Sequence, residues 1–270
     1  MQWTFHTAEH QRAELDLASG VVEVNFAATD EVQVSLEPLG PATERATELI
    51  NSAKVTCEGG HLIVSVPKRK LRDTPLRLAV LVPPQSRLNC STASADVQCS
   101  GLAGAVRVAT ASGDVTMDGP CDSADVSTAS GDVRLSRVLG EAHAKTASGD
   151  FSVDWVGGRA SCDTASGDVE IGQGGSDIKV RTASGDVKVG QACEGDVSVN
   201  CASGDIVVGV EAGVGAWLDM VTISGDTKCT LPAENSGEGD AVLRIACRTV
   251  SGDIRIQPGH GQSEDSRRWA

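Results

Sequence analysis

The segment Thr-Ala-Ser-Gly-Asp-Val at residues 110–115 decides the fold, because it returns along the chain at a fixed distance. The same block stands at 128–133, 164–169 and 182–187, and at 146–151 with Phe in the last place. Counted from a degenerate copy at Ser94, the serines of the Ser-Gly-Asp triplet follow at intervals of 18, 18, 18, 18, 18, 19, 21 and 27 residues. Such a period indicates stacked coils, each too small to bury its own apolar face.

Apolar and polar residues alternate on both sides of the triplet. Val169, Glu170 and Ile171 follow one copy, and Ile178, Lys179 and Val180 precede the next. A strand with one buried face has this period of two. We therefore expect an all-β fold, a single-stranded parallel β-helix (a β-solenoid) with coils of about 18 residues and two strands in each coil. The same alignment places Thr227 and Cys229, in the coil around Ser224, in the inward columns.

The triplet is predicted to form the corner between the two strands of a coil. Glycine suits a sharp turn because it tolerates positive φ and the close approach of another backbone. Aspartate accepts hydrogen bonds from turn amides, and the Thr two residues before the Ser is expected to bond backbone at the same bend. The structural corner residues are Gly113, Asp114, Gly131, Asp132, Gly149, Asp150, Gly167, Asp168, Gly185, Asp186, Gly204, Asp205, Gly225, Asp226, Gly252 and Asp253.

The pattern divides the chain into three parts. Residues 1–86 hold divergent coils and a capping helix, continuous with the solenoid, and residues 87–257 hold the regular repeat. Residues 258–270 have the composition of a disordered tail. The widest interval contains the 231–241 loop, which is expected to fold over the last coil.

Two features of the first part carry this interpretation. Residues 12–36 predict a divergent coil around Ser19-Gly20, with Leu15 and Leu17 before it and Val22, Val24 and Phe26 after it. Residues 42–53 place Ala46, Leu49, Ile50 and Ala53 at helical spacing. A short helix there can cover the N-terminal end of the core and hide a strand edge.

Nine cysteines are present, an odd number with no CxxC pair. Zinc sites favour close pairs, and secreted disulfide frameworks favour an even count in a short chain. Cys90, Cys162 and Cys247 fall in a column otherwise filled by Val, Ala and Met. We expect reduced, buried thiols that act as small apolar side chains.

The repeated TASGDV blocks, the ELDLASGVVEVNF pair of strands and the Pro84–Asn89 entry resemble the bacterial "putative adhesin" β-strand-repeat family. The resemblance covers about residues 12–257. It implies a β-helix, which agrees with the column pattern, and it implies adhesion through the family's name. It brings no catalytic residues to this chain.

Known catalytic motifs are absent, because the sequence contains no GxGxxG, GxxxxGK[ST], HExxH or GxSxG. The five histidines are scattered, and only His143 lies in the regular repeats. We therefore expect no enzyme, no catalytic residue and no cofactor, although polysaccharide-cleaving enzymes also use β-helices. Calcium-binding solenoids carry nine-residue blocks with a second Gly-Asp element that this repeat lacks, so we expect no metal site and turn-capping aspartates instead.

Charge and composition narrow the function further. The net charge of −14 argues against a nucleic-acid or anionic-membrane binder. There is no run of 18 apolar residues, and the start lacks the pattern of a secretory signal, so we expect a cytoplasmic protein.

Two classes of function remain. The first is a non-enzymatic scaffold or protein-interaction module, with Trp217 as a candidate partner anchor and an unknown protein partner; end-to-end or side-by-side association of identical chains is possible in such a stack. The second is an acidic DNA-mimic decoy for a DNA-handling protein, since residues 87–257 carry 13 basic and 24 acidic residues. A carbohydrate-binding or carbohydrate-cleaving β-helix is a third, weaker alternative.

Overall fold

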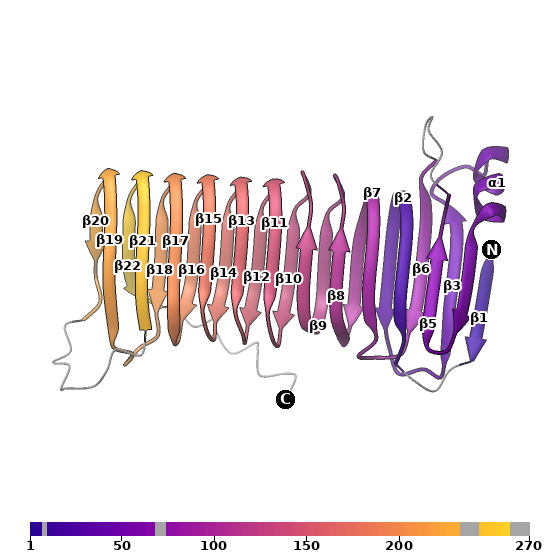
Figure 1. Ribbon diagram of the computed structural model, residues 1–270, viewed down its shortest axis with the longest axis horizontal. Helices are drawn as coiled ribbons and strands as arrows, with labels where there is room; N and C mark the ends of the chain where they lie inside the picture. The colour runs from indigo at the N-terminus through magenta and orange to yellow at the C-terminus, as the bar shows by residue number, and fades with distance from the viewer. Residues whose placement is uncertain (7–9, 68–73, 233–242, 260–270) are drawn as a thin grey trace. The chain divides into compact units, whose positions relative to one another are not determined.

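The alternating pattern forms strands in the computed structural model, which describes residues 1–6, 10–67, 74–232 and 243–259. The described chain is all-β with one short helix, and its fold is β-solenoid-like. It divides into two compact units, residues 1–137 and 138–270 (Figure 1). The expected 258–270 tail and 231–241 loop lie almost entirely outside the described residues.

Unit 1 begins with an irregular group of strands. β1 (Gln2–His6), β3 (Glu31–Pro38) and β6 (Leu76–Val82) pair antiparallel in that order, and β6 then pairs parallel with β2 (Arg12–Phe26). β4 (Lys54–Glu58) forms an antiparallel pair with β5 (His61–Ser65), which pairs parallel with the first half of β2.

The helix predicted over residues 42–53 is present as α1 (Glu44–Ser52). It begins at Thr43, whose Oγ1 accepts a hydrogen bond from the backbone N–H of Ala46 at 3.2 Å and so caps the first turn. Ala46, Leu49 and Ile50 are buried, and the helix packs beside β3. The apolar stripe therefore faces the N-terminal group of strands, as expected.

The rest of unit 1 has the regular repeat. β2 pairs parallel with β7 (Arg87–Gly101) along its whole length, with Ser19 opposite Ser94. That register confirms the divergent coil for residues 12–26, whereas residues 31–36 lie in β3, which pairs antiparallel with β1 and β6. β7 is followed by β8 (Ala103–Ala109), β9 (Val115–Ser127) and β10 (Val133–Val138), and β8 and β9 both add to the stack in parallel.

Unit 2 contains two rows of parallel strands. β11 (Ala142–Ser148), β13 (Ala160–Ser166), β15 (Ile178–Ser184) and β17 (Gly195–Ser203) form one row. β12 (Phe151–Val156), β14 (Val169–Gly174), β16 (Val187–Ala192) and β18 (Ile206–Val210) form the other. Residues one repeat apart lie opposite each other, as Ala160 and Ile178 do.

The order of the last two coils differs from the order in the sequence. β21 (Leu243–Ser251) pairs with β17 on one side and with β19 (Ala216–Ser224) on the other. β22 (Ile254–Pro258) lies in the same way between β18 and β20 (Thr227–Cys229). The final coil of the chain is thus inserted, and the earlier coil of β19 and β20, here called the terminal coil, forms the end of unit 2 (Figure 1).

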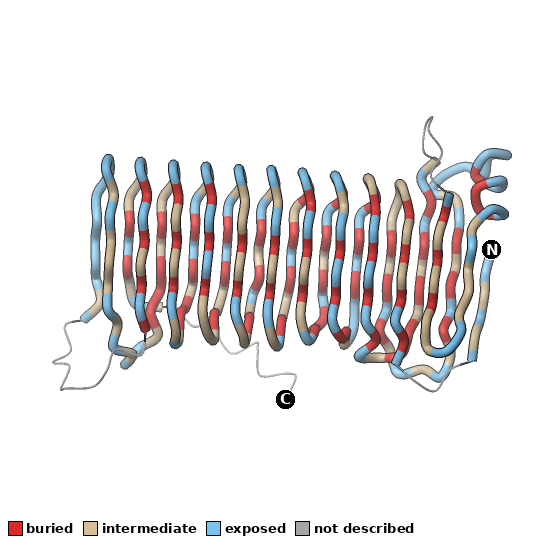
Figure 2. The backbone as a smooth tube through the Cα atoms, in the orientation of Figure 1, coloured by how far each residue is buried: buried red, intermediate tan, exposed pale blue. Residues whose placement is uncertain are grey.

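Inward columns are buried throughout the regular coils. Ile171, Ile178, Val180 and Ile254 are each at most 1% exposed. Phe151 is also buried; it stands three residues after its Ser, where most coils have Val. The terminal coil differs, because none of its residues is buried (Figure 2). The inward placement expected for Thr227 and Cys229 is therefore wrong: both are exposed, since their coil has a neighbour on one side only.

Corner glycines are required for two physical reasons. In unit 2 they have positive φ, as at Gly185 (+135°), a region that L-residues rarely adopt. In addition, a Cβ at Gly185 would lie 2.2 Å from the carbonyl oxygen of Gly167 in the adjacent coil. At Gly113 and Gly131 in unit 1 the second constraint acts alone: a Cβ at Gly131 would meet the carbonyl oxygen of Gly113 at 2.0 Å. The corner assignment made from the sequence agrees with this geometry.

We expect Gly185→Ala to lower the free energy of unfolding by at least about 2 kcal/mol, because it combines a disfavoured φ with a backbone clash. Gly215→Ala is the control, since a Cβ there meets nothing within 4 Å; its effect should stay within about 0.5 kcal/mol. Urea unfolding measures both. Equal effects of the two substitutions would contradict the close approach of coils at the corner.

Candidate functional site

The aspartates of the corner form a ladder of hydrogen bonds between adjacent coils. The backbone N–H of Asp168 donates to Asp150 Oδ1 at 2.9 Å, and that of Asp186 donates to Asp168 Oδ1 at 2.8 Å. The same bond joins Asp114 to Asp96, Asp132 to Asp114, Asp205 to Asp186, Asp253 to Asp205 and Asp226 to Asp253, at 2.8–3.0 Å. Each bond satisfies one backbone amide of the corner and ties its coil to the next.

At one corner the ladder bond also favours the charged form of the carboxylate. The N–H of Asp226, followed by the guanidinium of Arg255, lowers the pKa of Asp253 below its ordinary value. Arg255 Nη2 lies 3.1 Å from Asp253 Oδ2. Within the described ranges, no three His, Cys, Asp or Glu side chains gather where they could hold a metal ion. The aspartates thus act as acceptors for backbone amides.

Most of the threonines before the corner bond backbone, as expected, whereas Thr146 Oγ1 is buried without a hydrogen-bond partner. Thr128 Oγ1 accepts from the N–H of Gly131 at 3.0 Å, and Thr182 Oγ1 donates to the carbonyl oxygen of Ser184 at 3.1 Å. These bonds lie inside the bend. Together with the ladder, they give most of the repeated polar positions of the corner a structural role.

The terminal coil breaks the repeat on its outer face. Val221 stands in a column that holds Arg248, Asn200, Arg181 and Asp163 in the neighbouring coils. Ile223 immediately precedes its Ser, where most copies of the repeat have Ala. Ile223 is 79% exposed and Val221 is 47% exposed.

Trp217 lies on the same outer face and is 52% exposed. The guanidinium of Arg244 on the neighbouring strand β21 stands over its ring, 5.5 Å from the ring centroid. Between Trp217 and Val221, Asp219 Oδ2 pairs with Arg248 Nη2 at 2.9 Å. We call Trp217, Val221 and Ile223 the terminal-coil patch; it is apolar and is bordered by these paired charges.

The sequence pointed to Trp217 alone, and the structure adds Val221 and Ile223. Four of the seven exposed large apolar residues in the described chain lie on β19 and β21: Trp217, Val221, Ile223 and Val250. The signal that could have found the two missed residues is the break in the outward columns. At Trp217 and Val221, apolar side chains replace charged or amide residues, while Leu218 and Met220 keep the inward positions of the same strand apolar.

Six of the nine cysteines are buried, as expected, whereas Cys57 and Cys193 are half-buried and Cys229 is exposed. All nine are free thiols, and Cys90, Cys162 and Cys247 are buried as predicted. Desolvation raises the pKa of each of these three thiols to about 12. A thiol that stays protonated is a poor nucleophile. Cys229 on the terminal coil is exposed.

The family of the chain follows from its sequence. Residues 46–257 match the Toastrack DUF4097 family, and the chain belongs to this family. No curated protein matches the sequence. In the described part of the chain, no helix has the length and apolar character needed to cross a membrane.

Two solved structures resemble the whole chain. One is a "putative adhesin" from Bacteroides fragilis, with 12% identity, a TM-score of 0.50 and coverage of 95% of this chain and 96% of that one. The other is a "putative lipid binding protein" from Parabacteroides distasonis, with 16% identity, a TM-score of 0.51 and the same coverage. At these identities the likeness shows the fold. With the family match, it supports the resemblance to the "putative adhesin" family.

The buried thiols predict a loss of stability at alkaline pH. In the unfolded chain a thiol ionises near pH 9, whereas Cys162 in the folded chain holds its proton up to about pH 12. Between these values the folded state binds more protons, so stability falls as pH rises, by up to about 1.4 kcal/mol per pH unit for each such thiol.

Urea unfolding at pH 8, 9 and 10 measures this slope. Cys162→Ala should make the slope shallower, whereas Cys229→Ala, at an exposed thiol, should leave it unchanged. An unaltered slope in Cys162→Ala would show that Cys162 is not desolvated in the fold.

Proposed function

We propose that this protein is a non-enzymatic interaction module that binds a protein partner through the terminal-coil patch. Its framework is a single-stranded parallel β-helix with coils of about 18 residues. The ladder and inward columns hold the coils together, and the terminal coil presents the patch.

One observation carries this proposal: Trp217 and Val221 of the terminal coil are exposed in columns where the coils beside them have charged or amide residues, and exposed Ile223 lies opposite the exposed Val250 of β21. Exposed apolar patches with a polar rim are typical of protein interfaces. Trp217, with Arg244 over its ring, is the kind of residue that dominates interface energies. In addition, among the described residues β19 and β20 have paired strands on one side only, and a strand of the partner would add on their other side.

The regular coils favour this function over mimicry of DNA. Their acidic residues alternate with cations on the outer faces: Lys188 Nζ lies 2.6 Å from Glu170 Oε1, and Arg159 Nη2 lies 3.2 Å from Asp177 Oδ2. A DNA mimic needs a continuous acidic field, and these pairs interrupt it. The side chains that recur at the corner and in the inward columns bond backbone or form the core. This supports a non-enzymatic function.

The proposed location is the cytosol. Nine free cysteines, including exposed Cys229, suit a reducing compartment better than an oxidising one. A cytosolic protein partner fits both this location and the apolar chemistry of the patch.

The test is capture of the partner from a lysate of the protein's own cells with the immobilised full chain. Trp217→Ala combined with Ile223→Ser should reduce the recovered partner about 30-fold, the effect of losing about 2 kcal/mol at an interface hot spot. Sedimentation of the purified chain then tells whether the partner is a second copy.

The matched control is Leu139→Ala, which removes an exposed apolar side chain elsewhere in unit 2. It should capture as much partner as the unchanged chain. If the double variant is folded and still captures the full amount, the patch is not the binding surface and the proposal fails.

A further inference from the structure

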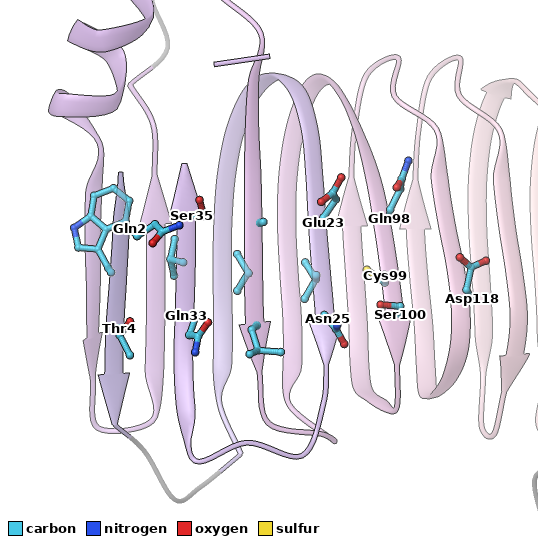
Figure 3. Close-up of a pocket in the computed structure, with 16 residues that line it drawn as sticks. Gln2, Thr4, Glu23, Asn25, Gln33, Ser35, Gln98, Cys99, Ser100 and Asp118 are labelled. Carbon is cyan, nitrogen blue, oxygen red and sulfur yellow. The ribbon is translucent and has the colours of Figure 1, made fainter. Parts of the chain in front are cut away.

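A groove with a volume of about 560 Å³ lies in unit 1. Its walls come from six strands, β1, β3, β6, β2, β7 and β9, which lie next to one another in the sheet. Figure 3 shows the polar lining side chains on one face of these strands. None of the interactions described for the corner or the terminal coil involves this groove.

Strand register arranges the lining side chains in two rows that run across the strands. One row is Gln2, Ser35, Ala79, Glu23 and Gln98; the other is Thr4, Gln33, Leu81, Asn25 and Ser100. These residues are exposed or half-buried, whereas Val24, Val34 and Val80 between the rows are buried. The rows therefore belong to the outer face of the sheet.

The hollow has a simple origin in side-chain size. Ser35 and Ala79 are small and stand in the middle of the first row, with the longer Gln2 and Gln98 at its ends. The second row has its one apolar outward residue, Leu81, at the same place. A ligand that lies across the strands thus meets an apolar floor and polar walls.

The polar side chains of the lining are neutral or acidic. It contains amide and hydroxyl side chains, two carboxylates (Glu23 and Asp118) and, among its described residues, no Lys, Arg or His. The nearest cation, Arg77, is held by Glu23, with Nη2 2.6 Å from Oε1. Two lining residues are fixed by neighbours, because Gln33 Nε2 donates to Glu31 Oε2 and Ser35 Oγ donates to Glu37 Oε1, both at 3.1 Å.

This lining excludes several ligand classes. Phosphates and acidic polymers need cations, which are absent here, and they would be repelled by Glu23 and Asp118. Trp3, Val24, Val34 and Val80 also line the groove, but an acyl chain across the strands would leave the amides and hydroxyls of both rows without hydrogen-bond partners. A neutral polyhydroxylated chain fits, because each hydroxyl both donates and accepts, as amides and hydroxyls do, and carboxylates accept from it.

We propose that the groove binds a neutral oligosaccharide lying across the strands. Six strands at a spacing of about 4.8 Å span about 24 Å, a length suited to a short oligosaccharide with one sugar for each strand or so. Gln2 and Gln98 of the first row contact its hydroxyl groups from one side, and Gln33 and Asn25 of the second row contact them from the other. Ala79 and Leu81 lie beneath the rings.

The direct test is titration calorimetry of the full chain with neutral hexasaccharides: the β-1,4- and β-1,3-linked glucans, the α-1,4-linked glucan and chitohexaose. At least one should bind with a Kd below about 1 mM. Oligogalacturonate and phosphatidylcholine vesicles serve as acidic and lipid probes. If no neutral hexasaccharide binds, or if only the acidic or lipid probe does, the proposal is overturned.

Variants place the binding in the groove. Ala79→Trp should abolish it, because an indole there fills the middle of the first row. Asn25→Ala combined with Gln98→Ala should weaken it about tenfold, the effect of two lost hydrogen bonds. Asn89→Ala, at an exposed asparagine of β7 that does not line the groove, should bind as the unchanged chain does. Unchanged binding in both the folded Ala79→Trp protein and the double variant would also overturn the proposal.

Discussion

The hydrogen bond between the carboxylate of one corner aspartate and the backbone N–H of the next is the interaction on which the other features depend. It recurs within both units at 2.8–3.0 Å and ties adjacent corners of a unit to one another. The bond requires adjacent corners to approach so closely that a Cβ on the corner glycine would overlap a carbonyl oxygen. Glycine and aspartate therefore recur together. The strands that leave the corner are then in register, so like residues stack in columns on both faces.

Because the columns are so regular, departures from them locate the surfaces where a function can lie. The corner residues bond one another, the inward columns form the core, and several outward charges are paired across adjacent coils, as Arg181 and Asp163 are. The terminal coil departs from this arrangement through its outward Trp217, Val221 and Ile223. The N-terminal strands depart from it through antiparallel pairing, which builds the polar groove. One chain thus offers two surfaces of different chemistry. The terminal-coil patch is apolar, and the groove has a polar lining without basic side chains among its described residues.

Much of the fold could be predicted from the sequence, because a period of two on either side of Ser-Gly-Asp determines which side chains point inward. Cys162, Thr182 and Leu49 lie where those patterns placed them. The order of the last coils could not be predicted: every coil offers the same backbone edge and the same register, so β19 and β21 could each follow β17. Because β21 lies next to β17, the coil of β19 and β20 stands at the end of unit 2, and its Cys229 is exposed. The groove could not be predicted from the sequence either, because Gln2, Ala79 and Gln98 are brought together by pairings between strands that are distant in the chain.

Hydrogen–deuterium exchange of the full chain, alone and with the captured partner, tests the central claim most directly. That claim is that each coil is stabilised by its neighbours and that the terminal coil binds the partner. In the free protein, amides of residues 216–229 should exchange faster than those of residues 178–208, because their coil has a neighbour on one side only. Partner binding should then slow exchange in 216–229. Slowed exchange in residues 160–208, with none in 216–229, would contradict the account.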